Sequence, residues 1–375
     1  MRRRDYYAAD LNELVDEWLP CDTRDPVAVG RAVAELPGQV AAVHSFVDTF
    51  VGTAAAVNRL LGLRGADPLA PGLARNKAVA RAALERVGLD PVRYGTLAVD
   101  ADELRSPIGY PCIAKPVDGA ASWDVRLVDD DAEVVALARA HASRDYGRGV
   151  RQRGELIFEE YLHGPLWSVE GWVADGIVDV FGWTDRVQAS PPDFAELSFG
   201  FAGDPPCPDA SSWAERTLAA LGYDFGPFHL EVILTQDGLR LLELNPRLVG
   251  CGAHSCLSLA SGVDVVDHVV GRLLGDEVPP VRATCAATAH MIVSGRSGVL
   301  KEVRGTETMI THPGFVGALL TVSPGDALDN TLSSNAAHLG YVIAEGKDRP
   351  QANQRAREAA ETLELVVGTK LSMGS

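Results

Sequence analysis

The sequence predicts an α/β fold in which helices and strands alternate along 375 residues. Apolar residues recur at helical spacing in segments such as 46–63 and 73–87, and short apolar runs typical of buried strands occur elsewhere. Glycine and proline breaks separate the segments, as at Ala70-Pro71-Gly72. A chain of this length has room for two or three domains.

The bulk composition argues against several classes of protein. A net charge of −17 disfavours a nucleic-acid partner or an anionic membrane surface, because both need clustered lysine and arginine. The six cysteines include no C-x-x-C pair, which favours reduced thiols over a disulfide framework or a zinc site. No apolar run is long enough to span a bilayer, and the basic N-terminus lacks the apolar stretch of a signal peptide. We therefore expect a cytoplasmic protein without nucleic-acid or membrane partners.

The individual elements follow from the same patterns. Helices are expected near residues 25–34 and at 46–63, 73–87, 211–221, 263–274 and 350–365. Strands are expected at 40–43, 110–116, 155–161, 167–173, 177–183, 287–292, 318–322 and 341–345. Ala174-Asp175-Gly176 predicts a hairpin between two of these strands.

The stretch L-E-V-I-L-T-Q-D-G-L-R-L-L-E-L-N-P-R-L-V-G, from Leu230 to Gly250, places acids inside apolar runs. We expect two strands joined by a three-residue loop, Gln236-Asp237-Gly238. That register pairs Glu231 with Glu243 on one face, with Cβ atoms roughly 5 Å apart. Asn245 lies two residues further along, on the same face.

Like charges placed opposite each other destabilise a sheet, and burying them unpaired costs more. A cation between Glu231 and Glu243 removes this conflict, and oxygen ligands favour Mg²⁺ or Mn²⁺ over Zn²⁺. Arg247 follows the second strand and is suited to clamp an anion. The alternative is an edge hairpin with solvated acids and an arginine partner. The hairpin therefore predicts a site for a metal and a nucleotide.

The motif E-V-I-L…L-L-E-L-N-P-R-L-V-G resembles the metal-binding hairpin of ATP-grasp enzymes, particularly the carboxylate–amine ligase branch that includes L-amino acid ligases. The resemblance extends from about Cys21 to Val367. It implies an ATP-grasp fold with an N-terminal domain at 1–75, a central and metal-binding region at 76–278 and a C-terminal lobe at 279–375. It also implies ATP and Mg²⁺ or Mn²⁺ as cofactors.

The same resemblance assigns roles to individual residues. Glu231, Glu243 and Asn245 match metal ligands, and Arg247 matches the arginine that holds the acyl group. The motif I-F-E-E-Y-L-H-G-P-L-W-S-V-E resembles the adenine hinge of the family, although F-E-E-Y-L alone is also typical of an ordinary strand end. Nucleotide contacts are thereby expected from Lys77, Lys115, Ser122, Glu159, Glu160, Tyr161, Leu162 and Leu242.

Substrate roles rest on weaker matches. His254 lies in a segment resembling the one that lines the acyl and amine pockets, but a loop histidine is as often an ordinary hydrogen-bonded residue. Asp185 and Arg186 end the G-W-T-D-R strand, near the expected substrate position. Glu170 is the candidate proton acceptor for the attacking amine.

Three features depart from the pattern of the family. Leu166 replaces the acid that binds the ribose, which would weaken nucleotide binding roughly tenfold to a hundredfold. The phosphate loop reads D-G-A-A-S-W-D-V, with Trp123 and Asp124 where an open glycine-rich loop is expected. Asp124 would repel phosphate unless it points away, and Trp123 either covers the nucleotide or packs in a core. The N-terminal domain is expected to be short.

The sequence thus predicts an ATP-dependent carboxylate–amine ligase that forms an amide through an acylphosphate. Its expected partners are ATP, a small carboxylic acid or amino acid, and an amine, and the resemblance implies a homodimer. Two alternatives remain at this stage. One is a nucleotide-binding protein with weak or lost catalysis, which Leu166, Trp123 and Asp124 favour. The other is an ATP-grasp enzyme of the carboxylase type.

Overall fold

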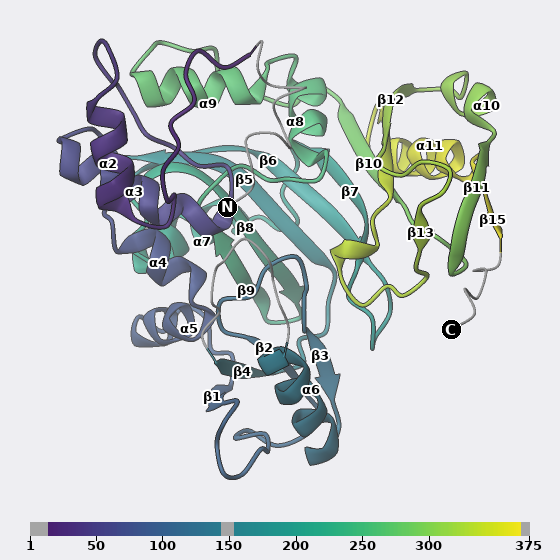
Figure 1. Cartoon of the computed structure of the whole chain (residues 1–375), viewed down its shortest axis with the longest axis horizontal. Helices are drawn as coiled ribbons and strands as arrows, with labels where there is room; N and C mark the ends of the chain where they lie inside the picture. Colours follow the sequence, from purple (N-terminus) through teal and green to yellow (C-terminus); the bar gives the residue numbers. More distant parts are fainter. Residues whose placement is uncertain (1–13, 144–153, 369–375) are drawn as a thin grey trace.

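The computed structural model describes residues 14–143 and 154–368, and contains three β-sheets surrounded by helices (Figure 1). Every strand pair in this part of the chain is antiparallel. The first thirteen residues of the predicted N-terminal domain lie outside the described residues. No helix in the described ranges is both long and apolar enough to cross a membrane.

The N-terminal region is helical, with α2 (Pro26–Ala34), η1 (Asp48–Phe50), α3 (Val51–Leu61), α4 (Ala70–Arg75) and α5 (Lys77–Arg86). The prediction of one helix over 73–87 is wrong, because Asn76 is extended and its side chain caps α5 by accepting from Ala78 and Val79 N–H. The predicted strand at 40–43 is also wrong. The side chain of Asn58 bonds to both the N–H and the C=O of Val43, in place of a neighbouring strand.

A small sheet has the order β1-β4-β2-β3 and consists of β1 (Tyr94–Ala98), β4 (Glu155–Glu160), β2 (Cys112–Pro116) and β3 (Arg126–Val128). Helix α6 (Asp131–Ser143) packs on it through Val134, Leu137 and Ala138. All five residues of β2 are buried. The strands predicted at 110–116 and 155–161 are therefore confirmed within two residues.

The large sheet has eight strands in the order β12-β14-β10-β7-β6-β5-β8-β9. Their bounds are β5 (Leu166–Ala174), β6 (Ile177–Gln188), β7 (Glu196–Ala202), β8 (Phe225–Thr235), β9 (Gly238–Asn245), β10 (Ala286–Ile292), β12 (Phe315–Leu320) and β14 (Gly340–Gly346). Three of these strands come from beyond residue 278. The domain boundaries expected from the sequence stay a prediction.

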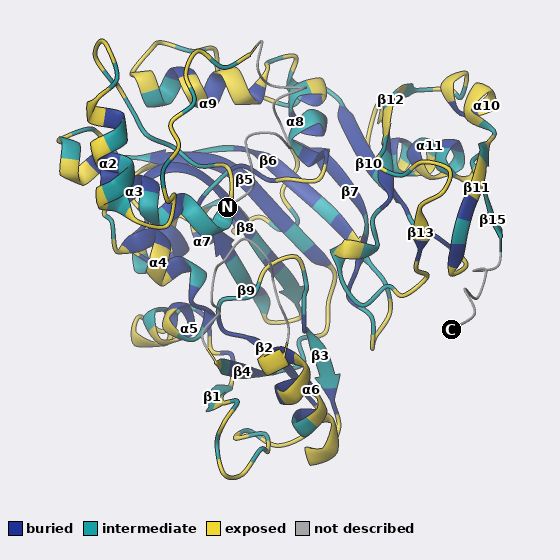
Figure 2. Cartoon of the chain, in the orientation of Figure 1, coloured by how far each residue is buried: buried dark blue, intermediate teal, exposed yellow. Residues whose placement is uncertain are grey.

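Helices α7 (Ala210–Ala220), α8 (Ala253–Ser261), α9 (Val265–Leu274) and α11 (Arg349–Glu361) pack against strands of the large sheet. A third sheet, β13-β11-β15, contains β13 (Ala327–Leu328), β11 (Gly298–Arg304) and β15 (Glu364–Gly368), with α10 (Thr306–Ile310) and the short turn η2 (Asn335–Ala337) nearby in sequence. Sequence patterns did not predict α8 or β15. The central strands of the large sheet are largely buried, whereas the helices expose their outer turns (Figure 2).

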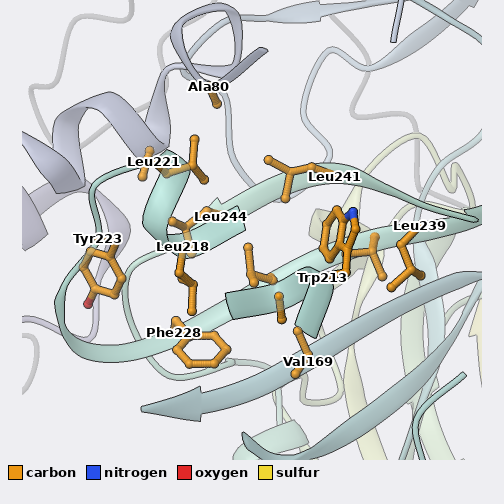
Figure 3. Close-up of a cluster of buried hydrophobic side chains, with 14 of the residues drawn as sticks. Ala80, Val169, Trp213, Leu218, Leu221, Tyr223, Phe228, Leu239, Leu241 and Leu244 are labelled. Atoms are coloured by element: carbon orange, nitrogen blue, oxygen red, sulfur yellow. The ribbon is translucent and has the colours of Figure 1, made fainter. Parts of the chain in front are cut away.

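Strand β8 separates the apolar core from the polar part of the molecule by simple alternation. Phe228, Leu230 and Val232 enter a core cluster that includes α7 residues such as Trp213. Figure 3 shows Phe228 and Trp213 in this cluster. His229 and Glu231 lie between them in sequence and therefore point to the opposite face. The mixed fold of helices and antiparallel sheets agrees with the predicted class, and the folded core fixes which face of β8 carries charge.

Phe228→Ala tests this core. Phe228 is fully buried, so its truncation leaves a cavity and should lower the free energy of unfolding by about 3–5 kcal/mol. Urea unfolding monitored by circular dichroism measures the loss. Leu60→Ala is the control, since Leu60 is 60% exposed and its change should stay within about 0.5 kcal/mol. Equal losses in the two variants would contradict the assignment of this core.

Candidate functional site

A cavity of about 490 Å³ lies between strands of the small sheet and strands β5, β6, β8 and β9 of the large sheet. It brings together every residue that the resemblance assigns to the nucleotide: Lys77, Lys115, Ser122, Glu159, Glu160, Tyr161, Leu162 and Leu242. Glu231, Glu243 and Arg186 line it as well. Residues as far apart in the sequence as Lys77 and Glu243 thus line the same cavity. Their binding roles stay predictions.

The hairpin of β8 and β9 pairs Glu231 with Glu243 as predicted, but through a different register. Thr235 pairs with Gly238, so the turn contains two residues where the sequence suggested three. A β-bulge at Leu242 adds the missing residue and restores the pairing of the two acids. Without the bulge, a one-residue slip would turn Glu243 to the other face. The bulge also brings Leu242 to the cavity wall.

Glu243 is held by two neighbours. Lys77 Nζ lies 2.8 Å from its Oε2, and the Asn245 amide donates to its Oε1 at 2.9 Å. Lys77 Nζ also donates to the carbonyl oxygen of Gly119 at 2.9 Å, so it connects Glu243 to the phosphate loop. Asn245 is buried and is absent from the cavity wall. A metal-binding role for Asn245 would require its amide to turn its oxygen toward the cavity.

Glu231 faces cationic partners of its own. Arg186 Nη1 lies 3.1 Å and His229 Nε2 lies 3.0 Å from its Oε1. Burial would raise the pKa of Glu231, but the charges of Arg186 and His229 outweigh burial and hold that pKa below its ordinary value. Burial also opposes charge on His229, whereas Glu170, 2.9 Å from Nδ1, raises the pKa of His229 to about 9.

A buried ion network includes two of the cavity-lining residues, Lys115 and Glu159. Arg81 Nε donates to Glu159 Oε1 at 2.7 Å, and its Nη1 donates to Asp90 Oδ2 at 2.7 Å. Lys115 Nζ lies 2.6 Å from the other oxygen of Glu159. Burial opposes the charge of Glu159, yet Arg81 and Lys115 lower its pKa to about 2. This network joins α5, β4 and β2, and Arg81 Nη2 extends it to the Leu241 carbonyl of β9 at 2.6 Å.

The two carboxylates fit a hard divalent cation. They face each other across the hairpin, both line the cavity, and each is neutralised by a protein cation. No group of three or more His, Cys, Asp or Glu side chains within the described residues could hold a metal by itself. Mg²⁺ commonly takes one or two carboxylates and completes its shell with phosphate and water. Glu231 and Glu243 are therefore suited to a metal that arrives with a nucleotide.

In the phosphate loop, the side chains of Asp124 and Trp123 point in different directions. Asp124 turns away from the cavity, and its Oδ2 lies 3.4 Å from His141 Nδ1 of α6 in a buried pair. Trp123 and Ser122 line the cavity, so the tryptophan is placed to cover a ligand. Ala121 and Ser122 adopt φ of 57° and 56°, the left-handed region where glycine is more usual. The loop thus keeps a conformation typical of glycine without glycine at these positions.

Leu166 lies in the cavity wall where the family pattern places an acid. It opens β5 directly after Gly164 and Pro165, and it is cross-strand neighbour to Arg186. Its side chain is buried and offers no hydrogen bond to a ribose. The hinge residues Tyr161 and Leu162 nevertheless line the same cavity. The departure at Leu166 is therefore local.

Arg247 has a partner that the sequence did not indicate. Its Nε and Nη2 donate to Asp48 Oδ1 and Oδ2 at 2.7 and 2.8 Å, and its Nη1 donates to the Leu248 carbonyl at 2.7 Å. Asp48 of η1 occupies one bidentate edge of the guanidinium in this conformation, and the anion-binding role expected of Arg247 stays a prediction. Burial opposes the charge of Arg247, but Asp48 raises its pKa, so the side chain stays cationic.

The structure separates the four remaining candidates. Arg186 lines the cavity, whereas its neighbour Asp185 points to the other face of β6 and accepts from Asn353 of α11 at 2.9 Å. Glu170 is fully buried and accepts from Ser168 and Thr184. His254 lies on α8 and is absent from the cavity wall.

Asp185 and His254 lie outside the wall of this cavity, and the substrate roles expected of them stay predictions. Glu170 contacts His229 and stays away from the cavity wall, so the geometry does not support proton transfer from an amine directly to it.

Several residues of the site were missed from the sequence. His229 precedes Glu231 by two positions in a strand, and Arg81 follows Lys77 by four in a helix, so alternation and helical spacing could have identified both. Asp48, Glu196 and Asn335 carried no such signal. They reach the site region by tertiary contacts between distant segments.

Comparisons with known sequences agree with this geometry. Residues 108–255 match the family described as ATP-grasp domain, and residues 290–368 match the L-amino acid ligase C-terminal domain 2. The chain therefore contains a segment similar to ATP-grasp domains, and its C-terminal region is similar to that of L-amino acid ligases. ATP with Mg²⁺ or Mn²⁺, the cofactor expected from the sequence, is the cofactor of ATP-grasp enzymes.

Individual relatives share less than a third of their residues with this chain. An uncharacterized protein of Sinorhizobium fredii is 28% identical over 87% of this chain and 68% of its own length. Carnosine synthase 1 of Gallus gallus is 28% identical over 74% of this chain and 32% of its own length. The crystal structure of L-amino acid ligase from Bacillus licheniformis has a TM-score of 0.79, with 21% identity, over 92% of this chain and 85% of that chain.

Glu159→Gln tests the buried ion network through its pH dependence. The folded pKa of Glu159 is lowered from 4.5 to about 2, so its charge stabilises the fold above the unfolded pKa and loses that effect as pH falls. The difference in unfolding free energy between wild type and Glu159→Gln should therefore shrink as pH falls below about 5. Urea unfolding at several pH values measures it. Glu103→Gln, at an exposed ion pair, is the control, and a difference independent of pH would contradict the network.

Proposed function

We propose that this protein is an ATP-dependent ligase that joins a small carboxylic acid or amino acid to an amine. The γ-phosphoryl group of ATP moves to a carboxylate oxygen, giving an acylphosphate and ADP. The amine nitrogen then attacks the carbonyl carbon, phosphate leaves, and an amide remains. The observation that carries the proposal is the facing pair Glu231 and Glu243, in one cavity with Lys77 and Lys115.

Each residue has a task in this scheme. Lys115 and Lys77 offset the charge of the nucleotide phosphates, and Tyr161 and Leu162 bound the adenine end. Glu231 and Glu243 hold the divalent cation. When bound, the cation neutralises charge on the phosphoryl group, which is the main requirement of phosphoryl transfer. The protein thus supplies charge and position, without a nucleophile of its own.

The acyl end depends on Arg247. Arg247 lies two residues beyond Asn245, in the segment that follows β9 and outside the wall of the cavity, which supports an acyl site next to the hairpin. An acid gripped by Arg247 must share its guanidinium with Asp48 or displace that side chain. The proton lost by the amine goes to solvent or to the departing phosphate, since Glu170 is outside the cavity wall.

The relatives support an amide-forming reaction. The C-terminal match is to the L-amino acid ligase C-terminal domain 2. A similar solved structure is named an L-amino acid ligase, and a similar sequence is named a carnosine synthase. An amino-acid substrate, a cytoplasmic location and a homodimer are part of the same proposal.

A second candidate is a nucleotide-binding protein with little catalysis. Leu166 favours it, because the cavity wall lacks the ribose acid of the family pattern. Trp123 favours it as well, because a bulky side chain stands in the phosphate loop. Nucleotide binding without turnover distinguishes this candidate from the ligase.

Glu243→Gln tests the ligase. Phosphate release from ATP and Mg²⁺ should require both an added acid and an added amine, and mass spectrometry should detect the amide. Loss of a metal-binding carboxylate should lower the rate by at least roughly a hundredfold. Glu103→Gln, at an exposed position, should match wild type. Release in Glu243→Gln within about threefold of wild type would remove the metal role of this residue.

A further inference from the structure

The connection between β13 and β14, residues 329–339, brings a residue of the C-terminal region into the cavity. Asn335, the first residue of η2, lines the cavity although it lies ninety residues beyond Asn245. Its position is not accounted for by the hairpin, the hinge or the phosphate loop. Its contacts show what it holds.

Asn335 makes three directed hydrogen bonds. Its side-chain Nδ2 donates to Glu196 Oε2 at 2.9 Å, and its Oδ1 accepts from the Glu196 N–H at 2.9 Å. Its own backbone N–H donates to the carbonyl of Ala121 in the phosphate loop at 3.2 Å. The side-chain pair fixes which amide atom faces the carboxylate, because a flipped amide would lose both bonds. Asn335 therefore touches the phosphate loop and the first residue of β7 together.

Glu196 connects Asn335 to Glu231 through Arg186. It is only 4% exposed, and its Oε1 is in close contact with Arg186 Nη2. The other terminal nitrogen of Arg186, Nη1, lies 3.1 Å from Glu231. One guanidinium thus contacts two carboxylates that line the cavity, Glu196 and Glu231, and Asn335 holds Glu196.

The sharing matters because Arg186 and a cation compete for Glu231. A buried carboxylate needs hydrogen-bond donors to remain in place, and Asn335 supplies the one that Arg186 does not. Without that donor, Glu196 loses its fixed position or its charge. The charge of Arg186 would then be directed more strongly at Glu231 and would oppose the binding of a divalent cation.

We propose that Asn335 is a positioning residue of the active site, acting through Glu196 and Arg186 to keep Glu231 available to the metal. The inference rests on the proposed function to the extent that Glu231 is a metal-binding residue. It assigns to the C-terminal region a part in metal binding, in addition to its packing against β7.

The test compares Asn335→Ala with the control Asn330→Ala. Asn330 is an exposed residue of the same connection and accepts from Ser297 Oγ at 2.7 Å, outside the cavity wall. Asn335→Ala keeps the backbone bond to Ala121. The bond between the Ala195 N–H and the Leu332 carbonyl also remains, as does the bond between the His338 ring and the Glu196 carbonyl. The variant is therefore expected to fold, which thermal unfolding checks.

Two binding measurements separate positioning from general support. In Asn335→Ala, the dissociation constant of Mn²⁺ in the presence of ADP, measured by electron paramagnetic resonance, should rise about tenfold. The dissociation constant of ADP without metal should stay within about twofold of wild type, since the phosphate loop keeps its contact. Asn335→Asp should weaken Mn²⁺ binding further, because its carboxylate faces that of Glu196. Asn330→Ala should change neither constant.

Other results would overturn the inference. Unchanged Mn²⁺ binding in folded Asn335→Ala would remove the positioning role. Equal losses of Mn²⁺ binding and metal-free ADP binding would show general support of the cavity. Absence of Mn²⁺ binding in wild type with ADP would contradict it as well.

The inference and the proposed ligase can fail separately. The expected Mn²⁺ changes without phosphate release by wild type under any acid and amine would leave Asn335 in its role and reject the ligase. Phosphate release by wild type would support the ligase. If Asn335→Ala then equalled wild type in kcat, KM and Mn²⁺ binding, the positioning role of Asn335 would be rejected.

Discussion

The repulsion between Glu231 and Glu243, which face each other across β8 and β9, governs the surrounding structure. Two like charges at one wall of a cavity need cations close by, and the protein provides Arg186 and His229 for one acid and Lys77 for the other. These cations come from three different elements. The acids therefore connect β6, β8 and α5 through ionic contacts at the wall of the cavity.

Charge compensation continues in a second group of buried residues. Arg81, Glu159 and Lys115 are buried together at the cavity, where an uncompensated charge would be costly. The same network ties the small sheet to α5 and to β9 through the Leu241 carbonyl. The two sheets that border the cavity are thus connected by ionic contacts, while apolar packing with α7 stabilises the other face of β8.

The contacts of Arg247 and Asn335 show how distant regions complete the site. Asp48 from the N-terminal helical region engages Arg247, and Asn335 from the C-terminal connection engages Glu196. Asp48 and Asn335 lie outside the hairpin, but each bonds to a charged residue of the site. The N-terminal region therefore positions Arg247, at the acyl end of the proposed reaction, and the C-terminal region positions Glu196, near the proposed metal site.

The sequence by itself determined the resemblance to ATP-grasp enzymes, the mixed fold and the pairing of the two acids, because apolar alternation and short motifs encode them locally. It gave the correct partner for Glu231 through an incorrect loop, since a bulge at Leu242 leaves no local signal. Only the tertiary structure decided that Asp124 turns to His141, that Asp185 turns to α11, and that Asp48 and Asn335 join the charged residues of the site. Side-chain direction and long-range contact depend on which faces the core buries, and a linear pattern does not specify them across hundreds of residues.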